Sequence, residues 1–145
     1  MPELIHTARL TSVTDLVPLL DLLTQQLAWP AKARFQIELA LEELVVNTFT
    51  HGQSLNSQGE HLAVAVDVLV QQDGHYLYIT LTDNAVAFDP THFGPPDVTS
   101  SAEDRKIGGL GLFFASQMMD SIDYHRDGQF NRVKLFKRLP PEPGS

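Results

Sequence analysis

Two polar side chains interrupt an otherwise apolar stretch, FQIELALEELVVNTFTHG, which runs from Phe35 to Gly52. Glu43 and Asn47 are four residues apart, so on a helix they project from the same side, one turn apart. Burying a carboxylate and a carboxamide among leucines and valines is costly unless a partner satisfies them. An acid that accepts a proton, beside an amide oxygen that holds a hard cation, is one such arrangement. In the alternative reading, Glu43 reaches solvent and Asn47 hydrogen-bonds a neighbouring loop.

A second acid stands at the end of a predicted strand, in the segment LTDNAVAFDP that spans residues 81–90. Asp83 stands at the end of a strand that is expected to be buried, which places its carboxylate at the edge of the core. Such a carboxylate can accept a hydrogen bond from an exocyclic amine, for example that of adenine. The alternative is an ordinary aspartate that caps a turn at the end of the strand.

A glycine-rich turn, Gly108-Gly109-Leu110-Gly111-Leu112, leads directly into a predicted helix. Glycines let backbone N–H groups approach an anion closely, and a helix N-terminus adds a partial positive charge. The combination suits a phosphate group. Its spacing fits neither the Rossmann nor the P-loop pattern, so neither of those assignments holds.

The helix that must carry Glu43 and Asn47 is predicted over residues 31–51, with Gly52 as its stop signal. Apolar residues occur on two opposite sides of this helix, so we expect it to be buried within the domain rather than laid on its surface. At about 100° per residue, one side carries Ile37, Leu41, Leu44 and Val45, and the other carries Phe35, Leu39, Val46 and Phe49.

The remaining pattern predicts a β, α, α, β, β, lid, α, β, β order. Alternating apolar residues and turn signals place strands at 3–10, 61–71, 76–82, 121–126 and 131–137. Helices are expected at 14–27, at 31–51 and from the glycine turn to residue 119, with a surface loop at 53–60. Strands that arrive as hairpins imply a mostly antiparallel sheet. We therefore predict an α/β (α+β) two-layer sandwich in which three helices cover one face of the sheet.

Length and composition restrict the class of protein. The 145 residues suggest one domain, at 1–138, with a lid at about 90–107 and a proline-rich tail at 139–145. A net charge of −8 argues against a nucleic-acid-binding surface, and the absence of cysteine excludes disulfides and zinc–thiolate sites. No apolar run approaches the roughly 18 residues of a membrane span, and no signal peptide is visible. A cytoplasmic protein is the expectation.

Taken in order, these features resemble the N-box, G1 box and G2 box of the GHKL ATPase superfamily, whose Bergerat ATP-binding fold occurs in gyrase and the histidine kinases. The size points to the bacterial anti-sigma-factor serine/threonine kinases of the RsbW and SpoIIAB type. Members are similar to this chain in EELVVNTFTHG, in DNAVAFDP and in GGLGLFFASQMMDSIDYHRDGQFNRVKLFK. The resemblance covers nearly the whole chain and is weakest over the first thirty residues.

The resemblance implies roles for the residues already noted. Glu43 would be the general base that deprotonates a serine hydroxyl, Asn47 would coordinate Mg²⁺, and Asp83 would bind the adenine amino group. The nucleotide side would also involve His51 and the glycine turn, where Gly108, Gly109, Gly111 and Leu112 border the phosphates. Arg105 and Lys106, just before that turn, either reach the γ-phosphate or form a solvated charge cluster beside Glu103 and Asp104.

The chain departs from the family at one position and inherits several partner expectations. Ala85 stands where the G1 box usually has glycine, and its methyl group would crowd the adenine or restrict φ. The expected function is an ATP- and Mg²⁺-dependent anti-sigma factor kinase that binds a sigma factor and phosphorylates a STAS-domain anti-anti-sigma protein. A homodimer without nucleic-acid or membrane partners is expected. The alternative is a non-catalytic nucleotide-binding module that sequesters a partner protein.

Overall fold

The computed structural model describes residues 2–91 and 109–140. The predicted lid from residue 92 onward, together with Arg105, Lys106 and Gly108, lies outside the described residues. The strands and helices follow one another as β1 (Glu3–Leu10), a 3₁₀ turn (Val13–Asp15), α1 (Leu16–Gln26), α2 (Ala31–His51), β2 (Ser54–Leu55), β3 (His61–Leu62), β4 (Val66–Asp73), β5 (Tyr76–Asp83), α3 (Gly109–Met118), β6 (Ser121–Asp127) and β7 (Phe130–Arg138).

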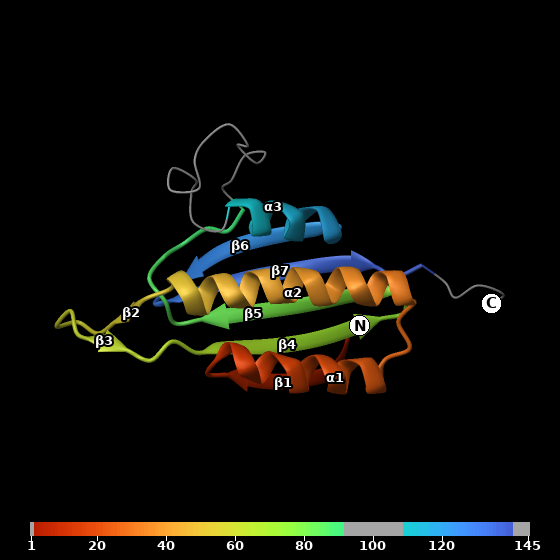
Figure 1. Ribbon diagram of the computed structural model, residues 1–145, viewed down its shortest axis with the longest axis horizontal. Helices are drawn as coiled ribbons and strands as arrows, with labels where there is room; N and C mark the ends of the chain where they lie inside the picture. Colours follow the sequence, from red (N-terminus) through yellow and green to blue (C-terminus); the bar gives the residue numbers. More distant parts are fainter. Residues whose placement is uncertain (1, 92–108, 141–145) are drawn as a thin grey trace.

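Five strands form one sheet in the order β1-β4-β5-β7-β6, and every neighbouring pair is antiparallel. All three helices lie against the same face of this sheet, with α2 between α1 and α3 (Figure 1). The β4–β5 and β6–β7 pairs are consecutive hairpins, and Gly74 and Gly128 adopt positive φ in their turns. The predicted two-layer α+β sandwich is confirmed.

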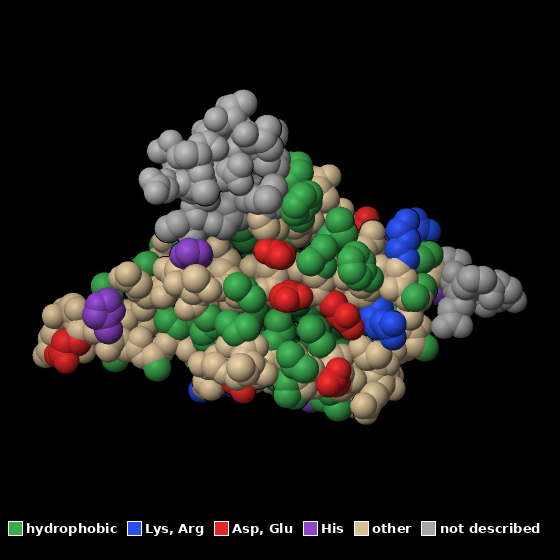
Figure 2. Space-filling view, in the orientation of Figure 1, with side chains coloured by type: hydrophobic (Ala, Val, Ile, Leu, Met, Phe, Trp, Pro, Cys, Tyr) green, Lys and Arg blue, Asp and Glu red, His purple; other side chains and the backbone are tan. Residues whose placement is uncertain are grey.

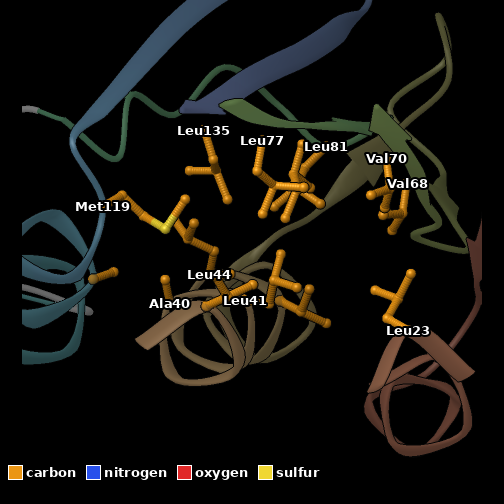
Figure 3. Close-up of a cluster of buried hydrophobic side chains, with 14 of the residues drawn as sticks. Leu23, Ala40, Leu41, Leu44, Val68, Val70, Leu77, Leu81, Met119 and Leu135 are labelled. Carbon is orange, nitrogen blue, oxygen red and sulfur yellow. The ribbon is translucent and has the colours of Figure 1, made fainter. Parts of the chain in front are cut away.

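The core lies between α2 and the covered face of the sheet. Alternate residues of β4 and β5 point to this face, as the period of two predicts. Figure 3 shows Leu41 and Leu44 of α2 directed toward Leu77, Leu81 and Leu135 of the strands. Helix α1 joins the same cluster through its buried leucines, Leu16, Leu19 and Leu23. The core therefore holds α2 rigidly beneath the strands that carry the other polar residues.

The outer side of α2 is more exposed than its apolar pattern predicted. Ile37, Leu41 and Val45 are almost completely buried against the sheet, whereas Phe35 is 63% exposed. Leu39 and Val46 are only half-buried. In Figure 2, apolar and acidic side chains alternate over this outer side of the helix layer. The expectation of burial on both sides was wrong, because no second layer formed by the described residues covers α2 and only one of its sides meets the sheet.

The region between α2 and β4 differs from the prediction of a loop followed by one long strand. The short strands β2 and β3 pair with each other as a separate hairpin, which extends from one end of the molecule (Figure 1). The long strand is interrupted because the Asn84 side chain takes over its hydrogen bonds. Asn84 Oδ1 accepts from Ala65 N and its Nδ2 donates to Ala63 O, both at 2.9 Å. Only from Val66 onward does the chain join the main sheet.

The end of β7 is anchored from both sides. Leu139, which the sequence assigns to the proline-rich tail, is instead buried in the core, and its N–H donates to His75 O. Lys137 is 7% exposed and donates to Met118 O at the last turn of α3, at 2.7 Å. Burial lowers the pKa of the Lys137 ammonium group.

None of the described helices has both the length and the apolar character that crossing a membrane requires.

Candidate functional site

A cavity of about 160 Å³ opens between the C-terminal half of α2, the end of β5 and the start of β7. Its walls are mostly apolar, and its polar groups converge from three separate segments of the chain. It is lined by Leu44, Val45, Asn47, Thr48, His51, Gly52, Val66, Leu81, Asp83, Ala85, Val86, Ala87, Phe88, Pro90, Asn131 and Val133. Apolar walls with a few convergent polar groups are typical of a small-molecule site.

Asp83 is the acid in this cavity, and the strand pattern explains its position. Leu77, Ile79 and Leu81 alternate toward the covered face of the sheet, and Asp83 is the next residue in that register. It is 9% exposed, and burial raises the pKa of its carboxyl group. Hydrogen bonds from Ala85 N and Asn131 Nδ2, both 2.9 Å long, act in the opposite direction. Both bonds reach Oδ1, so no described residue donates to Oδ2.

Asn131 lines the same cavity but was not predicted from the sequence as a site residue. It lies opposite Asp83 in the β5–β7 ladder and is 3% exposed. Besides Asp83, its Nδ2 contacts Ala85 O at 3.2 Å and Val86 O at 3.0 Å. A signal was available, because β7 alternates and an asparagine at a core-facing position of a strand requires a buried partner.

Asn47 and His51 approach the cavity from α2. Asn47 Oδ1 is buried and has no hydrogen-bond partner among the residues that the structure describes. An unsatisfied buried amide oxygen is costly, which indicates a site completed by a ligand. His51 is the last residue of α2 and is exposed at the rim of the cavity. Asn47, His51 and Asp83, predicted separately from the sequence, thus lie around one cavity.

Glu43 lies outside the lining of this cavity and contacts α3 instead. Its Oε2 is so close to Gly111 that a Cβ atom built on Gly111 would overlap it. The side chain is half-buried. The structure therefore brings Glu43 to the first turns of the helix that follows the glycine motif, one helical turn away from Asn47. The acid and the amide are neighbours along α2, as predicted, but face different surroundings.

Ala85 fits its position without strain. No described residue other than glycine has a positive φ, so the methyl group of Ala85 does not force an unfavourable backbone conformation. Ala85 is 3% exposed, and its Cβ packs against Gly52 at the end of α2, 3.3 Å from an ideal Cβ position there. The methyl group occupies part of the cavity wall, where it narrows the space available to a ligand.

The remaining members of the glycine motif are placed differently. Gly109 begins α3, so the described part of the motif is helical. Leu112 is 3% exposed and belongs to the hydrophobic core. Its side chain therefore serves packing, and a phosphate could meet only its backbone. Arg105, Lys106 and Gly108 remain predictions, because they lie outside the described residues.

The donor set suits magnesium bound together with a phosphate ligand. The described residues contain no group of three or more His, Asp or Glu side chains arranged to hold a metal ion. Mg²⁺ usually keeps several water molecules and binds one or two protein oxygens plus substrate phosphates. The unpartnered Oδ1 of Asn47 is one such oxygen, so the residues present fit a magnesium ion that arrives with a nucleotide.

Comparisons with known proteins agree with this geometry. A family model described as the histidine kinase-like ATPase domain matches residues 6–137. The serine/threonine-protein kinase BtrW of Bordetella bronchiseptica is 27% identical over 132 residues, which are 91% of this chain and 89% of that protein. The serine-protein kinase RsbW of Listeria monocytogenes is 32% identical over 95 residues, which are 63% of this chain and 57% of that protein.

A solved structure extends the comparison to three dimensions. The crystal structure of the RsbU and RsbW domains of Rv1364c from Mycobacterium tuberculosis superposes with a TM-score of 0.54 at 14% identity. The match covers 93% of this chain and 33% of that chain. At this identity the likeness shows the fold, and the site must be judged from its own residues.

Proposed function

Because this chain belongs to the family of histidine kinase-like ATPase domains, we propose that it is an ATP- and Mg²⁺-dependent protein kinase that phosphorylates a serine or threonine of a partner protein. The two curated relatives named above are protein kinases, which supports this activity. The structural observation that carries the proposal concerns the amide oxygen Oδ1 of Asn47. It is buried without a partner in a cavity that also contains the acid Asp83.

The cavity would bind the adenine end of ATP. Asp83 Oδ2 would accept the hydrogen bond from the exocyclic amine, because the other oxygen of this carboxylate already receives two hydrogen bonds. Asn47 would hold Mg²⁺ through Oδ1, and His51 would contact the nucleotide at the rim of the cavity. When bound, magnesium supplies charge neutralisation on the phosphates. The N-terminal turn of α3, with Gly109 and Gly111, would face those phosphates.

Glu43 would act at the acceptor hydroxyl. Its carboxylate takes the proton of the serine or threonine hydroxyl, and the freed oxygen bonds to the γ-phosphorus. The bond from that phosphorus to the bridging oxygen breaks, and ADP leaves with the bond's electron pair. Such transfers depend mainly on positioning, to which a base within reach adds roughly 10²–10⁴-fold.

The partners we propose are a sigma factor, which the protein would sequester, and a STAS-type anti-anti-sigma protein, which it would phosphorylate. Both partners are supported by the resemblance of EELVVNTFTHG, and of the segment from Gly108 to Lys137, to anti-sigma-factor kinases. We propose further that the protein acts in the cytoplasm as a homodimer. Its net charge of −8 makes nucleic acid an unfavourable partner.

The test is transfer of labelled γ-phosphate to a purified STAS partner. Glu43→Gln should lower the transfer rate by about 10²–10⁴-fold while ATP affinity changes little. Glu42→Gln is the matched control, because Glu42 is the adjacent residue and is exposed. No transfer to a partner whose binding has been verified would contradict the kinase proposal, and equal activity of the two variants would contradict the role of Glu43 as the base.

A non-catalytic module is the second candidate, and two observations favour it. Glu43 does not line the cavity, and the Ala85 methyl group takes up space in the cavity wall. In this reading the protein binds nucleotide as a structural ligand and acts only by sequestering its partner. Calorimetry that detects ATP binding, combined with the absence of any phosphoryl transfer, would select this reading.

A further inference from the structure

Behind the acid of the cavity lies a polar network that joins β6 and β7 to the segment after β5. We propose that Asn131 and Arg126 are positioning residues that fix the free oxygen of Asp83 and so make the site select an adenine over a 6-oxo purine. This inference rests on the proposed nucleotide-binding function. It concerns residues that do not themselves belong to the set predicted from the sequence.

The orientation of the Asn131 amide is determined by its neighbours. On one side, the Asp83 carboxylate and two backbone carbonyls can only accept, so they must face Nδ2. On the other side, Phe88 N at 3.3 Å and Arg126 Nη1 at 3.1 Å can only donate, so they must face Oδ1. The Tyr124 hydroxyl adds a third donor at 2.7 Å. If the amide were flipped, its oxygen would face the three acceptors and its NH₂ group would face the donors.

Arg126 connects this amide to the cavity wall. Its Nη1 donates to Ala85 O at 2.8 Å as well as to Asn131 Oδ1, and its Nε donates to Gly128 O at 3.2 Å. The side chain is half-buried, so these contacts are shielded from solvent more than those of a surface arginine. One guanidinium group therefore fixes both the segment that begins at Ala85 and the asparagine that contacts Asp83.

The consequence for Asp83 is a carboxylate with one occupied and one available oxygen. Ala85 N and Asn131 Nδ2 together engage Oδ1 and restrain rotation of the carboxylate, a torsion that is otherwise soft. The positive charge of Arg126 favours the ionised form that burial disfavours. An ionised carboxylate only accepts hydrogen bonds, whereas a protonated one also donates. Oδ2 thus pairs with an amine and is repelled by an oxo group.

The nucleotide pair that tests this contact is ATP and inosine triphosphate, because the latter has an oxo group in place of the adenine amine and an N1–H in place of the N1 acceptor. We would measure the Kd of each by calorimetry with Mg²⁺. The wild type should favour ATP by about 10- to 100-fold, as expected for one buried hydrogen bond. Arg126→Met and Asn131→Leu should lower ATP affinity about tenfold and bring the ratio of the two Kd values toward one.

Two further variants make the test specific. Tyr124→Phe removes a single hydroxyl and should lower the Kd ratio by a few-fold without endangering the fold. Arg132→Met is the matched control: Arg132 is the next residue after Asn131, pairs with Asp127 at 3.0 Å, and lines a hollow on the opposite, uncovered face of the sheet. It should keep the wild-type ratio. Thermal melts of every variant report whether the fold is retained.

The outcomes separate the two proposals. Selective ATP binding by the wild type that is lost in Arg126→Met, reduced a few-fold in Tyr124→Phe and kept in Arg132→Met supports the positioning role. An unchanged ratio in folded Arg126→Met and Tyr124→Phe overturns it while leaving the proposed function intact. Equal loss of ratio in Arg132→Met also overturns it. Failure of the wild type to bind either nucleotide overturns the proposed function and this inference together.

Discussion

Glu43 on α2 and Gly111 on α3 lie in direct contact, and no side chain larger than a hydrogen fits between them. A Cβ at Gly111 would overlap Glu43 Oε2 and come within 3.0 Å of Cδ. A side chain at residue 111 therefore requires the Glu43 carboxylate to move from its position. The contact links the proposed base to the helix whose first turn would face the phosphates.

Gly111→Ala should impair phosphoryl transfer more than folding. The new methyl group displaces the Glu43 carboxylate, which is the flexible end of a side chain, so the helices need not separate. A misplacement of about 1 Å at a reacting group can cost about 10²-fold in rate. Single-turnover transfer at saturating ATP would measure this loss, and a thermal melt would measure stability. Gln117→Ala, an exposed change on the same helix, is the control.

Asn47→Ala should abolish stabilisation by MgATP without lowering the stability of the nucleotide-free protein. It removes a buried oxygen without a partner, so the free energy of unfolding without nucleotide should match the wild type or exceed it by up to about 1 kcal/mol. Stabilisation by MgATP, which would reach about 2.7 kcal/mol at 100-fold excess over Kd, should disappear. Glu42→Ala, on the exposed side of the helix, should keep that shift. A preserved shift in Asn47→Ala would contradict the magnesium role.

Asp83→Asn should stabilise the nucleotide-free protein at neutral pH. Burial raises the pKa of the Asp83 carboxyl, so the native state holds its proton at pH values where the unfolded state has lost it. Stability is therefore lost as the pH rises from about 4, the ordinary aspartate pKa, through the raised value. The amide avoids this loss and can still accept at Oδ1. Urea unfolding of both proteins from acidic to neutral pH should show a gain that vanishes at the acidic end.

Lys137→Met should change the alkaline end of the stability profile. Burial lowers the pKa of Lys137, so below the ordinary lysine value the native state binds fewer protons than the unfolded state. Stability contributed by this group therefore rises with pH through that interval. The methionine variant should lack this rise, whereas Lys134→Met, an exposed change on the same strand, should retain it. Identical slopes in the two variants would contradict the prediction.

Local pattern was sufficient for most of the fold. Residues 3–10 and 31–51 were predicted with the bounds that β1 and α2 have, because alternation and helical periodicity are properties of neighbouring residues. The interruption after β3 was not foreseeable in the same way. It depends on the Asn84 side chain, which is 19 and 21 residues away from the backbone groups it bonds. Contacts of that range leave no local signature.

Individual residues of the site could be predicted from the sequence, but the hydrogen bonds that join them could not. Asn47 and Asp83 were recognisable because a polar residue in an apolar register requires a partner. Asn131 fits the same rule, yet its importance comes from six contacts that the pairing of β7 with both β5 and β6 creates. Arg126 carries no signal at all in the sequence, since an arginine near a hairpin turn is usually solvated.

The sequence by itself determined the elements, the layer architecture and the types of chemistry available, because these follow from periodicity, turn residues and side-chain functional groups. Tertiary structure alone decided which of these groups meet. It placed Asp83 against Asn131, left Asn47 Oδ1 without a partner, and directed Glu43 to Gly111 instead of into the cavity. Strand register and helix packing set those distances, and both depend on residues far apart along the chain.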